Sequence, residues 1–197
     1  MLTNPLTTLG RTLGFSFAAG VNLYATVAIL GLASRFGWVH LPPQFQVFDN
    51  NWIIGIALAL FVLEFIADKI PWVDSAWDAM HTFIRPLGGA LIAVATLGHS
   101  SPVVETAVGL LGGALAASSH FTTASARVMA NASPEPFSNW ILSFTEDGFV
   151  IGLGFLALTH PLAAGVVVLV AVAAIATFAH WIFRALRGAF RRNPAES

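Results

Sequence analysis

The chain has 197 residues, of which 56% are hydrophobic and 10% are charged, and its formal net charge is -1. An ordinary soluble domain is about 25% charged, so the composition argues against a soluble domain and predicts helices that face lipid. The absence of cysteine excludes disulfides, thiol catalysis and cysteine-ligated metals.

Six apolar runs are candidates for membrane-spanning helices, because a span needs about 20 mostly apolar residues. They cover roughly 13–34, 52–67, 86–98, 103–125, 141–159 and 161–183. We therefore expect an all-α, polytopic membrane protein with about six transmembrane helices, in which residues 1–197 form a single transmembrane domain ending in a basic tail over 184–197.

The first run, 13–34, is rich in Gly, Ala, Ser and Thr, which let helices approach closely in lipid. Its length, the presence of Asn22 and the poor cleavage site at Ala33-Ser34-Arg35 distinguish it from a signal peptide. We expect one packing helix here. The following segment, 35–52, contains Pro42-Pro43 and two Trp and predicts an interfacial loop.

The second run ends in Glu64, Asp68 and Lys69. Glu64 and Asp68 are four residues apart and share a helical face. Asp68 and Lys69 are explained if the helix leaves the membrane before Pro71. Glu64 lies inside the apolar run, where a carboxylate is costly unless it is protonated, paired or hydrated. This pattern indicates a functional acid at Glu64.

A second polar stripe follows, at spacings that place its members on one face of a helix. It consists of Asp74, Asp78, His81 and Arg85. This helix either lies on the membrane surface or dips back into the protein. Asp74, Asp78 and His81 are also candidates for ligands of a divalent cation, although no second motif supplies further ligands. Arg85-Pro86 is expected to open the third helix, with Arg85 paired to Asp78 or Asp74 or contacting an anionic ligand.

The fourth run places His120, Thr123 and Arg127 on one helical face. His120 is either a buried structural histidine or a proton-responsive group that faces an acid, because the unperturbed pKa of histidine is near 6.5. The sequence is compatible with both roles for His120.

The fifth run begins near Asn139 and carries Glu146-Asp147 several residues inside. Adjacent acids face different sides of a helix, so a single salt bridge cannot satisfy both. With Gly148 following them, we expect an interrupted helix that lines a cavity. The alternative is that the membrane begins at Phe149 and that both acids are interfacial.

The second half of the chain weakly echoes the first: Asn51-Trp52 matches Asn139-Trp140, and Glu64 matches Glu146. Two three-helix copies, about 13–98 and 103–183, would be inverted across the membrane, as in many transporters. The second and fifth helices would then face each other.

Positive charge is unevenly distributed along the chain. Both termini are expected in the cytoplasm, because Arg35 is then the one basic residue on the opposite side. The Arg-rich C-terminal run follows an apolar span, so it indicates an anchor near anionic lipid and not a nucleic-acid site.

The pattern E-x3-DKIP-x2-D-x3-D-x6-RP, from Glu64 to Pro86, is followed by R-x11-N-x6-ED, from Arg127 to Asp147. Together these motifs resemble a bacterial family of small membrane proteins known as domain of unknown function 4126. The similarity covers Gly14 to about Ala173. It implies a protein of the bacterial inner membrane and supplies no reaction.

These features predict a small transporter or channel for a cation or a proton-coupled or small polar solute, with a buried acidic site. Its expected partners are the lipid bilayer and a small ion or solute, and a homo-oligomer is compatible with the sequence; no cofactor and no nucleic acid are expected. The candidate pathway residues are Glu64, Asp68, Lys69, Asp78, Arg85, His120, Arg127, Asn139, Glu146 and Asp147.

Two alternatives remain open. One is an intramembrane enzyme that acts on a lipid head group through Asp74, Asp78 and His81. The other is a non-catalytic scaffold whose acids are all paired or solvated. A polar cavity joining Glu64 to Glu146 would favour the transporter, whereas a sealed bundle with Glu64 in a salt bridge would favour the scaffold.

Overall fold

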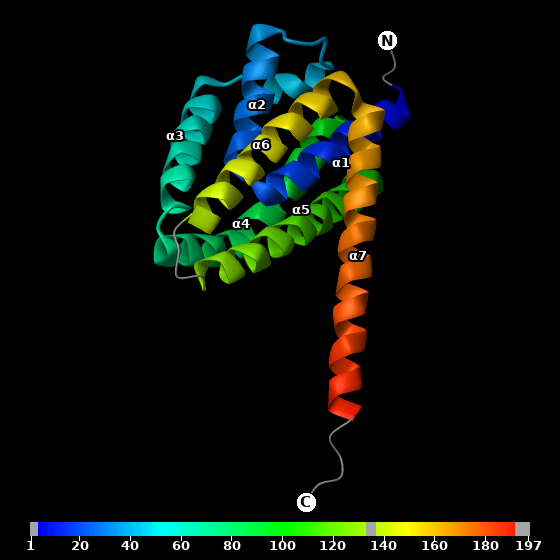
Figure 1. The fold of residues 1–197 in the computed structure, drawn as a ribbon. Helices are drawn as coiled ribbons and strands as arrows, with labels where there is room; N and C mark the ends of the chain where they lie inside the picture. The colour runs from blue at the N-terminus through cyan, green and yellow to red at the C-terminus, as the bar shows by residue number, and fades with distance from the viewer. Residues whose placement is uncertain (1–3, 133–136, 192–197) are drawn as a thin grey trace, which may run out of the picture.

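The protein is a bundle of α-helices (Figure 1). The computed structural model describes residues 4–132 and 137–191. Within them, the elements are α1 (Pro5–Val21), α2 (Leu23–Phe36), the 3-10 helix η1 (Pro43–Phe48), α3 (Asn51–Ala67), α4 (Pro71–Leu97), α5 (Pro102–Asn131), α6 (Phe137–Thr159) and α7 (Pro161–Arg191).

Four of these helices are long and apolar enough to cross a membrane: α4, α5, α6 and α7 as far as Ala185. Two shorter apolar helices, α2 and α3, accompany them. The chain is thus a helical membrane protein, as its composition predicts. The expected count of six spans is not supported.

The first apolar run does not form the single helix that we expected. It breaks at Asn22, whose backbone is extended with φ -147° and ψ 104°. The Asn22 side chain accepts a hydrogen bond from Ala25 N at 2.9 Å and so caps the start of α2. The same side chain donates to Asp147 Oδ1 at 3.1 Å, which ties the break to α6.

The two halves of this run travel in opposite directions along α6. Before the break, Gly14 of α1 packs against Ala157. After the break, Ile29 of α2 packs over Gly154. Asn22 itself contacts Asp147 of α6, and both of these contacts lie C-terminal to Asp147 along α6. The chain therefore turns back at Asn22, so α1 and α2 form a re-entrant hairpin whose tip is Asn22. The hairpin lies at the centre of the bundle (Figure 1).

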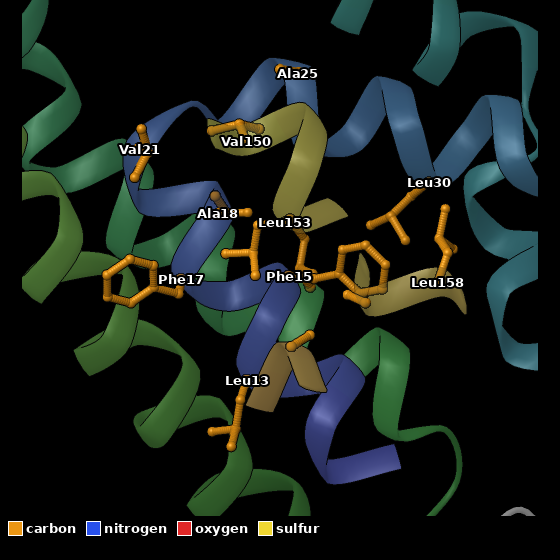
Figure 2. Close-up of a cluster of buried hydrophobic side chains, with 14 of the residues drawn as sticks. Leu13, Phe15, Phe17, Ala18, Val21, Ala25, Leu30, Val150, Leu153 and Leu158 are labelled. Carbon is orange, nitrogen blue, oxygen red and sulfur yellow. The ribbon is translucent and has the colours of Figure 1, made fainter. Parts of the chain in front are cut away.

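The hairpin provides much of the apolar core. Every residue of α1 from Thr12 to Val21 is buried. In Figure 2, Phe15 of α1 lies beside Leu153 of α6, and Leu30 of α2 lies near Leu158. Because these side chains exclude lipid and water from the middle of the bundle, polar groups that enter it must find partners within the protein.

Small residues allow α4 and α5 to lie very close to each other, and α1 to pack against both. A Cβ atom on Gly89 or Gly112 would lie 2.4 Å from an alanine Cβ of the other helix. Ser16 of α1 donates to the Gly89 carbonyl at 3.3 Å. This close approach is what brings the polar face of α4 against the hairpin tip.

Two helix boundaries differ from the sequence prediction. Pro86 does not open a helix, since α4 runs continuously from Pro71 to Leu97. The expected interruption near Gly148 is also absent, because α6 is continuous from Phe137 to Thr159. The stripe from Asp74 to Arg85 is buried inside α4, so it neither lies on the surface nor forms a separate segment.

The two ends of the described chain lie at opposite ends of the bundle (Figure 1). Gly10, near the start of α1, packs against the Pro161 carbonyl at the start of α7. From there α7 runs the length of the bundle and beyond it. This arrangement does not show on which side of the membrane each end lies, so the expected cytoplasmic position of both termini is neither confirmed nor contradicted. Residues 192–197 of the predicted basic tail lie outside the described residues.

The predicted repeats also differ in construction. The first copy begins with the α1–α2 hairpin, whereas the second begins with the continuous helix α5. The inverted repeat is therefore not supported.

Candidate functional site

Two arginines organise a buried ionic network where the end of α3, the start of α4, the end of α5 and the start of α6 meet. The first is Arg127, which is 3% exposed. Its Nη1 donates to Asp74 Oδ1 at 2.7 Å, and its Nη2 donates to Asp68 Oδ2 at 2.8 Å. Its Nε donates to Glu146 Oε2 at 2.9 Å. One guanidinium on α5 thus joins carboxylates from α3, α4 and α6.

The second is Arg85 of α4, which is 1% exposed. It forms an ion pair with Glu64 and lies 3.8 Å from Asp78. Its Nη1 is 3.0 Å from His120 Nδ1 and donates to the Gly20 carbonyl at 3.4 Å. The last carbonyls of α1 carry partial negative charge, so a cation is favourable there.

The sequence prediction for Arg85 is partly right. Asp78 is its neighbour as expected, but Asp74 pairs with Arg127 instead. Arg85 does not stand at a helix start, because α4 begins at Pro71. Its ion pair with Glu64 is one of the features expected of a scaffold.

The hairpin tip contacts the network through Asn22 and Asp147. The start of α2 carries partial positive charge, which favours a nearby carboxylate. Glu146 therefore pairs with Arg127 and Asp147 with Asn22, because adjacent residues point to different sides of a helix. The sequence offered one signal for this contact: a single Asn within a run of small and apolar residues.

Lys69 closes one side of the network between α3 and α6. Its Nζ donates to the Phe65 carbonyl at 2.8 Å and to Ser143 Oγ at 3.1 Å. The ammonium lies 3.4 Å from the Phe65 ring centroid and 5.1 Å from that of Phe144, within the range of cation–π attraction. Burial lowers the pKa of Lys69 below its ordinary value, against the opposing effect of nearby Asp68.

Amides and hydroxyls extend the network beyond the predicted residues. Asn131 donates to Asp74 Oδ2 at 2.8 Å and accepts from Asn139. Ser143 donates to Asp68 Oδ2 at 3.1 Å. The sequence analysis identified Asn139 but missed Asn131 and Ser143, because an amide or a hydroxyl near a helix end carries no signal of its own.

The three residues proposed as metal ligands do not share a site. Asp74 contacts Arg127, and Asp78 lies near Arg85. His81 instead has its Nε2 3.0 Å from the Tyr24 hydroxyl and its Nδ1 2.7 Å from the Trp77 carbonyl. Within the described part of the chain, no cluster of three or more His, Cys, Asp or Glu residues forms a metal site.

Carboxyl groups outnumber cations in this region. The six acids are Glu64, Asp68, Asp74, Asp78, Glu146 and Asp147, all at most 8% exposed. The cations that form ion pairs with them are Arg85 and Arg127, whereas Lys69 donates to Ser143, which in turn donates to Asp68. Two buried carboxylate oxygens, Glu64 Oε2 and Glu146 Oε1, have no hydrogen-bond partner among the described residues.

Residues 9–181 match the family model described as Domain of unknown function (DUF4126). The chain belongs to this family. All the network residues of this DUF4126 protein lie inside the matched range. Neither the search of curated proteins nor the search of solved structures found a match for it.

Proposed function

We propose that this DUF4126 protein carries a small cation, or a solute coupled to protons, across the bacterial inner membrane. The observation that supports this most is the excess of buried carboxyl groups over cations. Ionised acids without a counter-charge are costly at membrane depth, so the excess is neutralised by bound protons or cations. Because the acids must bind protons or cations to be neutralised, the site is suited to binding and releasing them during transport.

Arg127 would act as the switching partner. Its guanidinium bonds three carboxylates on three other helices. Neutralising one of them by a proton or a cation weakens its attraction to Arg127, which permits that helix to move relative to the others. A protonation event is thereby coupled to a change in helix packing.

The re-entrant hairpin supports the same proposal. Irregular backbone at membrane depth is tolerated where it is buried in protein or lines a cavity, and transporters place such breaks at their binding sites. Here the break at Asn22 meets Asp147, and the end of α1 meets Arg85. The tip would separate the network from the opposite side of the membrane.

The network end of the bundle is proposed to face the cytoplasm. Lys69 lies at this end, and Arg184 and Arg187 lie on the part of α7 that extends beyond it. Positive residues near span ends favour the cytoplasmic side. The start of α1 would then face the periplasm.

A scaffold is the second candidate, because Glu64 is held by Arg85 in a buried ion pair. The two proposals differ in what the charges do. Glu64 and Glu146 each pair with an arginine, as a scaffold requires, but their second oxygens, Glu64 Oε2 and Glu146 Oε1, have no hydrogen-bond partner among the described residues. The lipid-enzyme alternative loses support because Asp74, Asp78 and His81 are not assembled into one site.

The test is a flux measurement in proteoliposomes that contain a pH-sensitive dye. An imposed Na⁺ or K⁺ gradient should change the internal pH in vesicles with the wild-type protein. Glu64→Gln and Glu146→Gln should each lower this flux at least tenfold. Glu105→Gln is the matched control, since Glu105 lies at the start of α5, accepts a hydrogen bond from Ser100 N and does not belong to the ionic network.

Two results would overturn the proposal. One is a wild-type response no larger than that of protein-free vesicles. The other is unchanged flux in both network variants while their helix content matches that of the wild type, which is the outcome that a scaffold predicts.

A further inference from the structure

A cavity of about 550 Å³ lies between α2, η1, α3 and α4. Its volume is in the range of pockets that bind small molecules, roughly 300–1,000 Å³. Trp52, Ile56 and Leu60 of α3 form one wall, and Gly88 and Leu91 of α4 form the facing wall. The cavity is therefore a space between two helices that belong to the membrane domain.

The chemistry of the walls excludes ordered water. A buried water needs two to four polar partners, and the polar groups on the lining side chains are the Tyr24 hydroxyl and the Trp52 indole N–H. The Tyr24 hydroxyl is already bonded to His81 Nε2 at 3.0 Å. Hydrocarbon is what this cavity can hold favourably.

The cavity is open to the bilayer. Trp52 is 79% exposed and Leu91 is 72% exposed, and they lie on opposite walls. Along α3, the lining extends from Trp52 to Leu60, a rise of about 12 Å at 1.5 Å per residue. One leaflet of the hydrocarbon core is about 15 Å thick, so the groove has nearly the length of an acyl chain in one leaflet.

We propose that this groove binds one acyl chain of a membrane phospholipid. The chain lies between α3 and α4 and fills the space that their side chains leave. The site does not depend on the proposed transport activity, because its walls belong to a different region from the ionic network.

The groove ends next to the network. Leu60 lies one turn before Glu64 on α3, and Gly88 lies three residues after Arg85 on α4. A bound acyl chain therefore sets the separation of the two helices that carry the Glu64–Arg85 ion pair. The acyl chain thereby holds α3 and α4 apart next to the Glu64–Arg85 ion pair.

The first test is native mass spectrometry of the protein extracted in a mild detergent. Wild-type protein is expected to retain one phospholipid per chain. Ala95→Phe places a ring in the groove, since Ala95 lines it, and should lower the retained phospholipid at least fivefold. Ala174→Phe, on an exposed position of α7, should leave retention unchanged. Equal retention in all three proteins would overturn the proposal.

A second measurement uses wild-type protein alone, so it does not depend on the folding of a variant. A phospholipid with a photoactivatable diazirine in its acyl chain is reconstituted with the protein and cross-linked by light. Groove residues Ile56 and Leu91 should be labelled at least fivefold more than Leu169 and Val170, which are similarly exposed on α7. Equal labelling of the two regions would show that no specific site exists.

Discussion

Replacing Arg127 by Met should destabilise the protein strongly. Arg127 is paired with Asp68, Asp74 and Glu146, and its side chain is 4% exposed. Removing one partner of a buried ion pair costs about 3–5 kcal/mol, because the remaining charge is buried without compensation. Three carboxylates lose their partner here, so we expect Arg127→Met to lower the free energy of unfolding by at least about 3 kcal/mol.

The control is Arg35→Met. Arg35 is paired with Asp49 at 2.8 Å, but the two side chains are 32% and 37% exposed. Ion pairs of this kind contribute about 0–1 kcal/mol. The comparison therefore isolates the effect of burial, since both substitutions remove a guanidinium from an ion pair.

A second substitution tests the cause of the loss. Glu146→Gln removes one of the carboxylates that Arg127→Met leaves uncompensated, so it should cost less in that background than in the wild type. Residues in direct contact typically show coupling of about 0.5–3 kcal/mol in such double-mutant cycles. Additive effects would mean that the Arg127–Glu146 ion pair contributes little to the fold.

The assay is reversible unfolding in mixed detergent micelles, with the helical circular dichroism signal as the readout. The wild type and all four variants, including the double variant, are compared at the same pH and ionic strength. If Arg127→Met and Arg35→Met differ by less than about 1 kcal/mol, the buried network is not what holds α3, α4, α5 and α6 together, and the reasoning fails.

Two further substitutions test the hairpin in the same assay. Asn22→Ala removes both the cap of α2 and the hydrogen bond to Asp147, and should lower the free energy of unfolding by about 1–3 kcal/mol; a change below about 0.5 kcal/mol would show that the break does not need this side chain. Gly20→Ala places a Cβ atom 2.0 Å from Ser119 Oγ and should cost about 1–3 kcal/mol. Gly148→Ala is its control, because no atom lies within 4 Å of the added Cβ, and should be neutral or stabilising by up to about 1 kcal/mol. Equal effects at the two glycines would contradict the close packing of α1 on α5.

Much of the site was predictable because charge is rare in this sequence. Only 10% of the residues are charged, and a charge within an apolar run is costly unless it has a partner. The predicted residues from Glu64 to Asp147 consequently meet in one region. Apart from Asp78 beside Arg85, their partners were not predictable, because Arg127 contacts Asp68 across 59 positions and Asp74 across 53.

The boundaries of helices were predicted less well, for a related reason. Pro86 and Gly148 are typical of helix starts and interruptions, yet both lie inside continuous helices. Local propensity is a weak guide where tertiary contacts stabilise an entire helix face. The stripe from Asp74 to Arg85 is held inside α4 by ion pairs and hydrogen bonds to other helices.

The sequence by itself determined that the protein is helical and inserts into a membrane, because hydropathy and composition are properties of each segment alone. It also determined which polar residues require partners. Only the tertiary structure decided that the first apolar run turns back at Asn22. A single Asn is compatible with a continuous helix, and the contact that stabilises the break comes from Asp147, 125 positions away. Which carboxylate meets which arginine was decided in the same way, by packing between distant segments.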